Sequence, residues 1–271
     1  MYFTVREPEG AETAVVVEVP HAGLGADAEA LGTLAAPAHA LARDADLYVD
    51  ELYADAPLEG ASLIVARVSR YVCDLNRAES DVDALAVEGA AHANLPHGLV
   101  WRTTTEDAPA LTGPLPRHEL ERRLELIYRP YHAALQALLE RKRQRFGFAI
   151  LLAGHSMPSR GRAGHTDPGR ERADVVPGSR GRTSAAAPVI DAPARLAAEL
   201  GWSVAHDDPY RGGFTTSHYG RPEHGVHAVQ VELARRLYMD ERTLARDPKH
   251  FSEVARYCRT LVATLGDLAL A

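Results

Sequence analysis

Short apolar runs rich in β-branched residues alternate with amphipathic stretches along most of the chain. Five runs predict strands, at 14–19, 61–68, 146–154, 203–208 and 225–233. Between His118 and Phe146, apolar residues at three- and four-residue spacing predict a long amphipathic helix with a kink near Pro130. Shorter helices are expected at 44–54, 189–200 and 240–266. Strands that alternate with helices indicate an α/β sandwich.

One long segment has no such periodicity. Residues 157–185 are rich in Gly, Pro, Arg and Ser, which predicts a loop. Long loops in a compact domain are more often functional than idle, so this loop is expected beside a site.

Composition narrows the class of protein. The 271 residues are 46% hydrophobic and 25% charged, which fits one globular domain over 1–271. A formal charge of -7 without a basic run argues against a nucleic-acid partner and favours a small molecule. Cys73 and Cys258 lie far apart, and neither a signal peptide nor a run of roughly 18 apolar residues is present, so a reducing cytoplasm without membrane attachment is expected. The oligomeric state stays open.

Polar residues follow three of the predicted strands. His21 comes after AVVVEVP, His155 after FAILLAG, and Glu232 after VHAVQV. Side chains just past the carboxyl ends of strands line the ligand crevice of an α/β sheet. A catalytic zinc uses three protein ligands, often imidazoles with a carboxylate, so the two histidines predict a metal site. The alternative is that each histidine only bonds a loop carbonyl.

The third ligand is expected from the acids at 43–51. Asp44 is predicted to cap the helix that begins there. Asp46 and Asp50 lie one helical turn apart on one face, so either can reach the metal.

Glu232 is the predicted general base. Burying an unpaired carboxylate costs free energy, so its presence here suggests a function. Beside a metal-activated water, the carboxylate can act as a general base. The alternative is an ion pair with Arg235 or Arg236.

Basic residues after the second strand point to an acidic substrate. Arg70, Asn76 and Arg77 lie within SRYVCDLNR, and guanidinium groups bind carboxylates bidentately. A structural pair between Asp74 and Arg77 is the alternative. The loop 210–216 contains two glycines, Thr215 and Arg211. Arg211 is expected either to bind a second carboxylate of the substrate or to be a surface charge.

The chain resembles the N-formylglutamate amidohydrolases, zinc enzymes of histidine degradation that are related in fold to zinc carboxypeptidases and aspartoacylase. The resemblance runs nearly end to end, on PHAG at 20–23, DADLYVDELY at 44–53, SRYVCDLNR at 69–77, GHSMPS at 154–159, ADVVPG at 173–178, RGGFTTSHYGRP at 211–222 and GVHAVQVELARRLYMDE at 225–241. It implies a single-domain, three-layer α/β sandwich with a mixed central sheet, of the zinc carboxypeptidase (phosphorylase/hydrolase-like) type.

The same resemblance implies roles for individual residues. His21, His155 and an acid hold one zinc ion per chain, and Asp46 is favoured over Asp50 for that acid. Glu232 acts as the base.

For the substrate, local similarity to aspartoacylase implies that Arg70, Asn76 and Arg77 bind the molecule. Asn76 and one arginine, with Arg70 as the catalytic choice, are expected to polarise the scissile carbonyl. Arg211 and Thr215 complete the expected substrate site. The implied reaction is zinc-dependent hydrolysis of N-formyl-L-glutamate to formate and L-glutamate.

Two segments depart from the family pattern, namely the loop 92–102 and a charged insertion at 165–172. They leave open a different substrate, either another N-acyl acidic amino acid or a peptide. A non-catalytic carboxylate-binding protein is a further alternative, against which Glu232 argues. His132 and His227 are expected to pack in the core rather than to bind metal.

Overall fold

A mixed six-stranded sheet forms the centre of the molecule. The computed structural model describes residues 1–91 and 94–270, so His92 and Ala93 of the divergent loop lie outside it. The strand order is β1-β3-β2-β4-β6-β5, in which β2, β3, β4 and β6 are parallel and the edge strands β1 and β5 are antiparallel. The strands are β1 Phe3–Arg6, β2 Val15–Val19, β3 Ser62–Ala66, β4 Ala149–Met157, β5 Val175–Gly178 and β6 Val226–Ala234.

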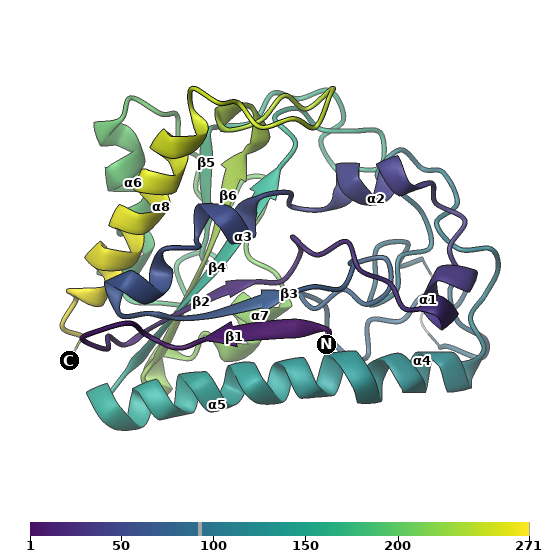
Figure 1. The fold of residues 1–271 in the computed structure, drawn as a ribbon, viewed down its shortest axis with the longest axis horizontal. Coiled ribbons are helices and arrows are strands. Elements are labelled where there is room, and N and C mark those ends of the chain that lie inside the picture. Colours follow the sequence, from purple (N-terminus) through teal and green to yellow (C-terminus); the bar gives the residue numbers. More distant parts are fainter. Residues whose placement is uncertain (92–93, 271) are drawn as a thin grey trace.

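Helices cover both faces of this sheet (Figure 1). On one face lie α4 (Arg117–Arg123), the π-helical turn Leu124–Tyr128, α5 (Arg129–Phe146) and α7 (Phe214–Tyr219). On the other lie α3 (Val49–Leu52), α6 (Ala187–Glu199) and α8 (Phe251–Gly266). The short helices α1 (Ala28–Gly32) and α2 (Ala38–Asp44) and the 3-10 turns Ala56–Glu59, Pro222–His224 and Arg235–Leu237 complete the chain. The expected three-layer α/β sandwich is confirmed.

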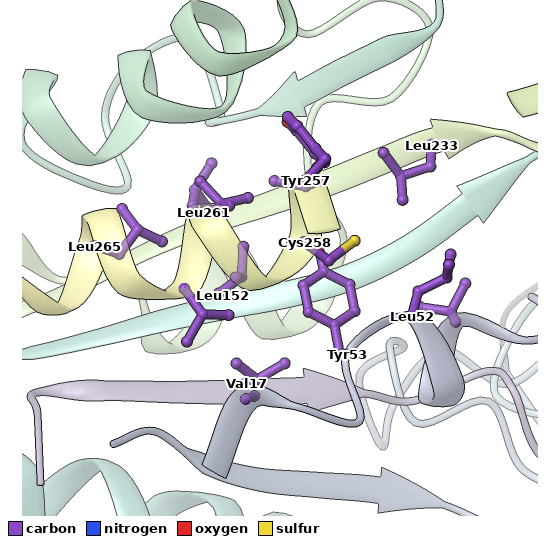
Figure 2. Packing of buried hydrophobic residues seen from close by; sticks show 14 of the residues in the cluster. Val17, Leu52, Tyr53, Leu152, Leu233, Tyr257, Cys258, Leu261 and Leu265 are labelled. Carbon is purple, nitrogen blue, oxygen red and sulfur yellow. The ribbon is translucent and has the colours of Figure 1, made fainter. Parts of the chain in front are cut away.

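The central strands read as uninterrupted apolar runs because both of their faces are buried. Successive residues alternate between the two layers, so Val17 packs toward α8 whereas Val16 packs toward α5. In Figure 2, side chains of α8 (Cys258, Leu261 and Leu265) face the sheet near Leu152, and the ring of Tyr53 lies beside Cys258. Both cysteines of the chain are free and buried.

The predicted strand at 203–208 is wrong. Val204 makes only an isolated bridge to Val175, and the edge of the sheet is instead occupied by β5, inside the segment predicted as loop. The chain at 203–207 runs beside β5 and shares backbone hydrogen bonds with it: the N–H of Val175 donates to the carbonyl of Ser203, and the N–H groups of Ala205 and Asp207 donate to the carbonyls of Val175 and Pro177. Side-chain bonds of Asp174 and Asp207 reinforce this contact. Pro177 has no N–H to donate back, so the pairing stops at one bridge and no regular strand forms at 203–208.

The predicted helix at 44–54 is also wrong in its first half. Helix α2 ends at Asp44, Tyr48 has φ of 69°, and α3 is short. Asp44 caps no helix start; its buried carboxylate accepts hydrogen bonds from Tyr71 and Thr105 and pairs with Arg162. Those bonds tie the end of α2 to the segments that carry these three partners.

The long helix at 118–146 is confirmed as α4 and α5, which form one nearly straight run in Figure 1. Pro130 has no N–H to donate, and directly before it the helix has a π-helical turn, in which the N–H of Arg129 bonds the carbonyl of Leu124.

The C-terminal helix begins at Phe251 rather than at 240, because Asp240 and Asp247 bond the N–H groups of the turns before it. Within the described part of the chain, none of the helices combines the length and the hydropathy needed to cross a bilayer.

Glu18, a buried acid on β2, is expected to make the unfolding free energy depend on pH. Burial raises the pKa of Glu18 to about 7, and its carboxyl has one partner, the hydroxyl of Tyr131 at 3.1 Å. The folded state therefore binds more protons than the unfolded state between pH 4.5 and about 7, so this group lowers the unfolding free energy by ~3 kcal/mol as the pH rises through that window. In Glu18→Gln this decrease in unfolding free energy is expected to be absent. Urea unfolding at a series of pH values measures the unfolding free energy of both proteins.

The control is Glu88→Gln, because Glu88 is exposed. That variant should keep the wild-type pH dependence. Parallel stability profiles of wild type and Glu18→Gln would contradict the expectation.

Candidate active site

Three residues that are distant in sequence meet at the carboxyl end of the parallel strands. His21 follows β2, Asp46 lies between α2 and α3, and His155 lies on β4; all three are buried. One potential ligand atom from each lies within 4.8 Å of the others. His155 lies inside its strand rather than after it, because β4 continues to Met157, and Glu232 lies near the end of β6, which runs to Ala234.

The donor atoms of this cluster fit a zinc ion. Nδ1 of His155 lies 3.1 Å and Nδ1 of His21 lies 3.5 Å from Oδ2 of Asp46. Nε2 of His21 donates to Oδ1 of Asp74 at 2.7 Å, so its buried Nδ1, which has no hydrogen-bond partner, keeps a free lone pair. Two imidazoles and one carboxylate, with a histidine oriented by a second carboxylate, match the chemistry of a zinc site.

Asp50 lies outside the cluster. It sits on α3, and its carboxylate faces Arg67 at 3.4 Å near the surface. The non-helical residues 45–48 separate the two acids, so Asp46 turns inward and Asp50 does not.

Hydrogen bonds keep the cluster charged despite its burial. Burial opposes ionisation, but the hydrogen bond from His155 and the neighbouring imidazole of His21 hold the pKa of Asp46 well below its ordinary value. Burial and Arg70 oppose protonation of His21, yet Asp74 and Asp46 raise its pKa. The carboxylates are therefore anionic at neutral pH.

Glu232 lies opposite His155 in the register of β4 and β6. Burial raises its pKa; the charge of His155 opposes the increase, and that of Asp46 adds to it. Neither expected ion-pair alternative forms, because Arg235 pairs with Asp46 at 3.1 Å and Arg236 pairs with Asp174.

Gln230 orients Glu232, a role that the sequence did not indicate beforehand. Its Oε1 accepts from Nδ2 of Asn76 at 3.1 Å and from the N–H of Gly213 at 2.8 Å, so its Nε2 must face Oε1 of Glu232 at 2.7 Å. The only prior signal was the i, i+2 spacing of Gln230 and Glu232, which places them on one face of β6.

Asp74 partners Arg70, not Arg77. Its carboxylate accepts from Arg70 at 2.9 Å, from the indole N–H of Trp101 at 2.9 Å and from His21. The guanidinium of Arg70 also stacks over Trp101, 4.4 Å from the ring centre. The structural pair between Asp74 and Arg77 is therefore not formed, and Arg70 is fixed beside the cluster.

Asn76 lines the cavity, whereas Thr215 lies behind it. The N–H and hydroxyl of Thr215 bond Oδ1 of Asn76 at 2.9 and 3.2 Å, and Thr215 is not among the residues lining the cavity. Thr215 therefore orients Asn76 through hydrogen bonds instead of lining the cavity as expected. Gly213 allows this packing, because a Cβ there would lie 2.3 Å from the amide nitrogen of Asn76. Gly154 likewise leaves room for the ring of Tyr53.

The cluster opens into a cavity of about 390 Å³. Its wall contains more arginines than acids, and most of the arginines are neutralised: Arg162 pairs with Asp44, Arg172 with Asp167, Arg235 with Asp46, Arg70 with Asp74 and Arg43 with Glu106. Within residues 1–91 and 94–270, Arg77, Arg180 and Arg211 have no carboxylate in ion-pair distance. Nε of Arg77 is buried without a partner, and Arg211 is exposed at the rim. The cavity is suited to an anion.

The charged insertion forms part of the cavity wall through His165, Thr166 and Asp167. His132 packs against Tyr128 and Tyr219 of the core, and Nδ1 of His227 accepts the N–H of Ala186, so neither faces the cavity, as expected.

A family model described as N-formylglutamate amidohydrolase matches residues 13–239. The chain belongs to this family. Its relatives include N-formylglutamate deformylases of Pseudomonas putida, 34% identical over 84% of this chain and 82% of that protein, and of Pseudomonas aeruginosa, 33% identical over 84% and 83%. Membership of the amidohydrolase family makes the chain a hydrolase of amide bonds, and it confirms the resemblance.

Solved structures agree with this membership. N-formylglutamate amidohydrolase from Ralstonia eutropha JMP134 is 32% identical, with a TM-score of 0.90 over 98% of this chain and 97% of that one. A gene product of Agrobacterium tumefaciens, 20% identical with a TM-score of 0.69 over 97% of this chain and 94% of its own, shares the fold.

Proposed function

We propose that this member of the N-formylglutamate amidohydrolase family is a zinc-dependent deformylase of the cytoplasm, which hydrolyses N-formyl-L-glutamate to formate and L-glutamate in histidine degradation. The observation that carries the proposal is the buried cluster of His21, Asp46 and His155 beside Glu232, at the base of a cavity with unpaired guanidinium groups. The activity named for the Pseudomonas relatives supports the choice of substrate.

His21, Asp46 and His155 would hold the zinc ion. The ion would supply Lewis acidity to the reacting water and carbonyl. Asp74 keeps the proton of His21 on Nε2 and leaves Nδ1 available, while Arg235 holds Oδ1 of Asp46. These contacts pre-orient the ligands.

Glu232 moves the proton. Its carboxylate, held by Gln230, accepts the proton of the attacking water and later gives it to the departing nitrogen of glutamate. A carboxyl whose pKa burial raises suits both steps, because its basicity lies nearer to neutral pH.

Arginines bind and polarise the substrate. Arg77 and Arg211, which have no carboxylate partner among the described residues, would match the two carboxylates of N-formylglutamate. Nη1 of Arg70 would stabilise the developing oxyanion, because its hydrogen bond to the carbonyl of Asp44 is long, at 3.5 Å, and readily exchanged. Asn76 presents Nδ2 beside His155.

Elemental analysis and formate release from N-formyl-L-glutamate test the proposal together. We expect about one zinc ion per chain and turnover that is lost on dialysis against a chelator and recovered with Zn²⁺. Turnover without metal would refute the metal assignment. Metal without formate release would refute the substrate and leave another N-acyl acidic amino acid, or a binding function, to be tested.

A further inference from the structure

A strained turn after β5 faces the cavity. Arg180, Gly181 and Arg182 have φ of 55°, 74° and 64°, three consecutive residues in the left-handed region. Only glycine adopts this conformation without strain, and two of the three are arginines. Such strain persists where surrounding contacts impose it, and it concentrates at ligand-binding sites.

Asp207 imposes this conformation. Its carboxylate accepts the N–H groups of Ser179 at 2.6 Å and of Gly181 at 2.8 Å, and the hydroxyl of Ser179 at 3.2 Å. The same hydroxyl oxygen accepts the N–H of Arg182 at 3.0 Å. The turn is thus built around one carboxylate.

The turn sends its two arginines in different directions. Arg182 pairs with Asp191 at 2.8 Å, where both side chains are about half exposed. Arg180 lines the cavity instead, and its only side-chain bond among the described residues is a 3.3 Å contact to the carbonyl of Gly212. Its backbone N–H bonds the carbonyl of Arg211 at 2.8 Å, so the cavity rim carries two neighbouring arginines.

We propose that Arg180, held by the Asp207-anchored turn, is a specificity residue that binds the side-chain carboxylate of the substrate together with Arg211. This inference rests on the proposed function. Arg77 follows Asn76 directly and lies deeper, which suits the α-carboxylate next to the scissile amide. The side-chain carboxylate is farther from that amide and reaches the rim. The enzyme therefore prefers an acidic side chain to its neutral isostere.

The test compares N-formyl-L-glutamate with N-formyl-L-glutamine in wild type, Arg180→Ala and the matched control Arg182→Ala. Arg180→Ala is expected to lower kcat/KM for the glutamate substrate by about 10- to 100-fold, chiefly through KM, because one charge-assisted contact is lost. Turnover of the glutamine substrate should change by less than about 2-fold, since it lacks the charge. Arg182→Ala should change neither, and Arg180→Lys should recover part of the preference.

Equal losses on both substrates, or no loss on either, would overturn the assignment. Binding of the products L-glutamate and L-glutamine, measured by calorimetry, gives the same comparison without turnover. If wild type releases no formate but still binds L-glutamate more tightly than L-glutamine, and Arg180→Ala removes that preference, the proposed reaction fails while the role of Arg180 stands. If wild type shows no preference in either assay, the role of Arg180 is refuted.

Discussion

Replacement of Glu232 by glutamine is expected to lower kcat for amide hydrolysis by about 10²- to 10⁴-fold while bound metal and KM stay close to wild type. Glutamine has the same shape but cannot accept a proton. Its Oε1 can still accept the hydrogen bond from Gln230, which reaches Glu232 at 2.7 Å, so the surrounding contacts are preserved. The loss would therefore report proton transfer rather than a disturbed structure.

Steady-state formate release and elemental analysis of the same preparations measure the two effects. Glu171→Gln is the matched control, because Glu171 is exposed and does not line the cavity. Near-normal turnover in Glu232→Gln would show that another group handles the proton. Simultaneous loss of metal would instead assign Glu232 to the metal site.

The sequence predicted the central strands well and the edge poorly. Strands β2, β3, β4 and β6 are buried on both faces, so each is a continuous apolar run whose identity does not depend on its neighbours. Strand β5 has four residues including Pro177, too few to show a period, and it forms because β6 offers it a partner. The segment 203–208 runs beside β5 but makes a single bridge to it, because Pro177 offers no N–H to continue the pairing.

The candidate site was also predictable only in part. His21, His155 and Glu232 were found because each belongs to, or directly follows, a strand that the sequence shows clearly. The local pattern did not separate Asp46 from Asp50, because both were assigned to one helix, and the preference for Asp46 came from the family resemblance alone. The break at 45–48 distinguishes them, and it depends on contacts that a local pattern cannot show.

The supporting residues escaped prediction because their partners are remote in sequence. Gln230 meets Asn76, Trp101 meets Asp74 and Arg235 meets Asp46 across separations of 154, 27 and 189 residues. Only the fold brings these residues together. Because such residue types are common throughout the chain, the sequence does not distinguish them from other polar residues.

Asp46→Asn is expected to weaken zinc binding by at least 10- to 100-fold and to abolish turnover with it, whereas Asp50→Asn keeps both. Asparagine removes the anionic ligand between the two histidines, whose Nδ1 atoms lie 3.1 and 3.5 Å from Oδ2 of Asp46. It also leaves buried Arg235 without its carboxylate, which lowers stability, because an uncompensated buried charge is costly.

Chelator competition measures the zinc affinity of each variant, and thermal unfolding followed by circular dichroism shows whether Asp46→Asn remains folded at the assay temperature. Asp50→Asn is the matched control, since its carboxylate makes a solvent-exposed contact at 3.4 Å whose loss should change stability by less than about 1 kcal/mol. A folded Asp46→Asn that binds zinc as tightly as wild type would refute the ligand assignment, and weaker zinc binding in Asp50→Asn alone would transfer it to Asp50. Because the two acids lie four residues apart yet face opposite environments, the pair of variants separates metal ligation from the general effect of removing a negative charge.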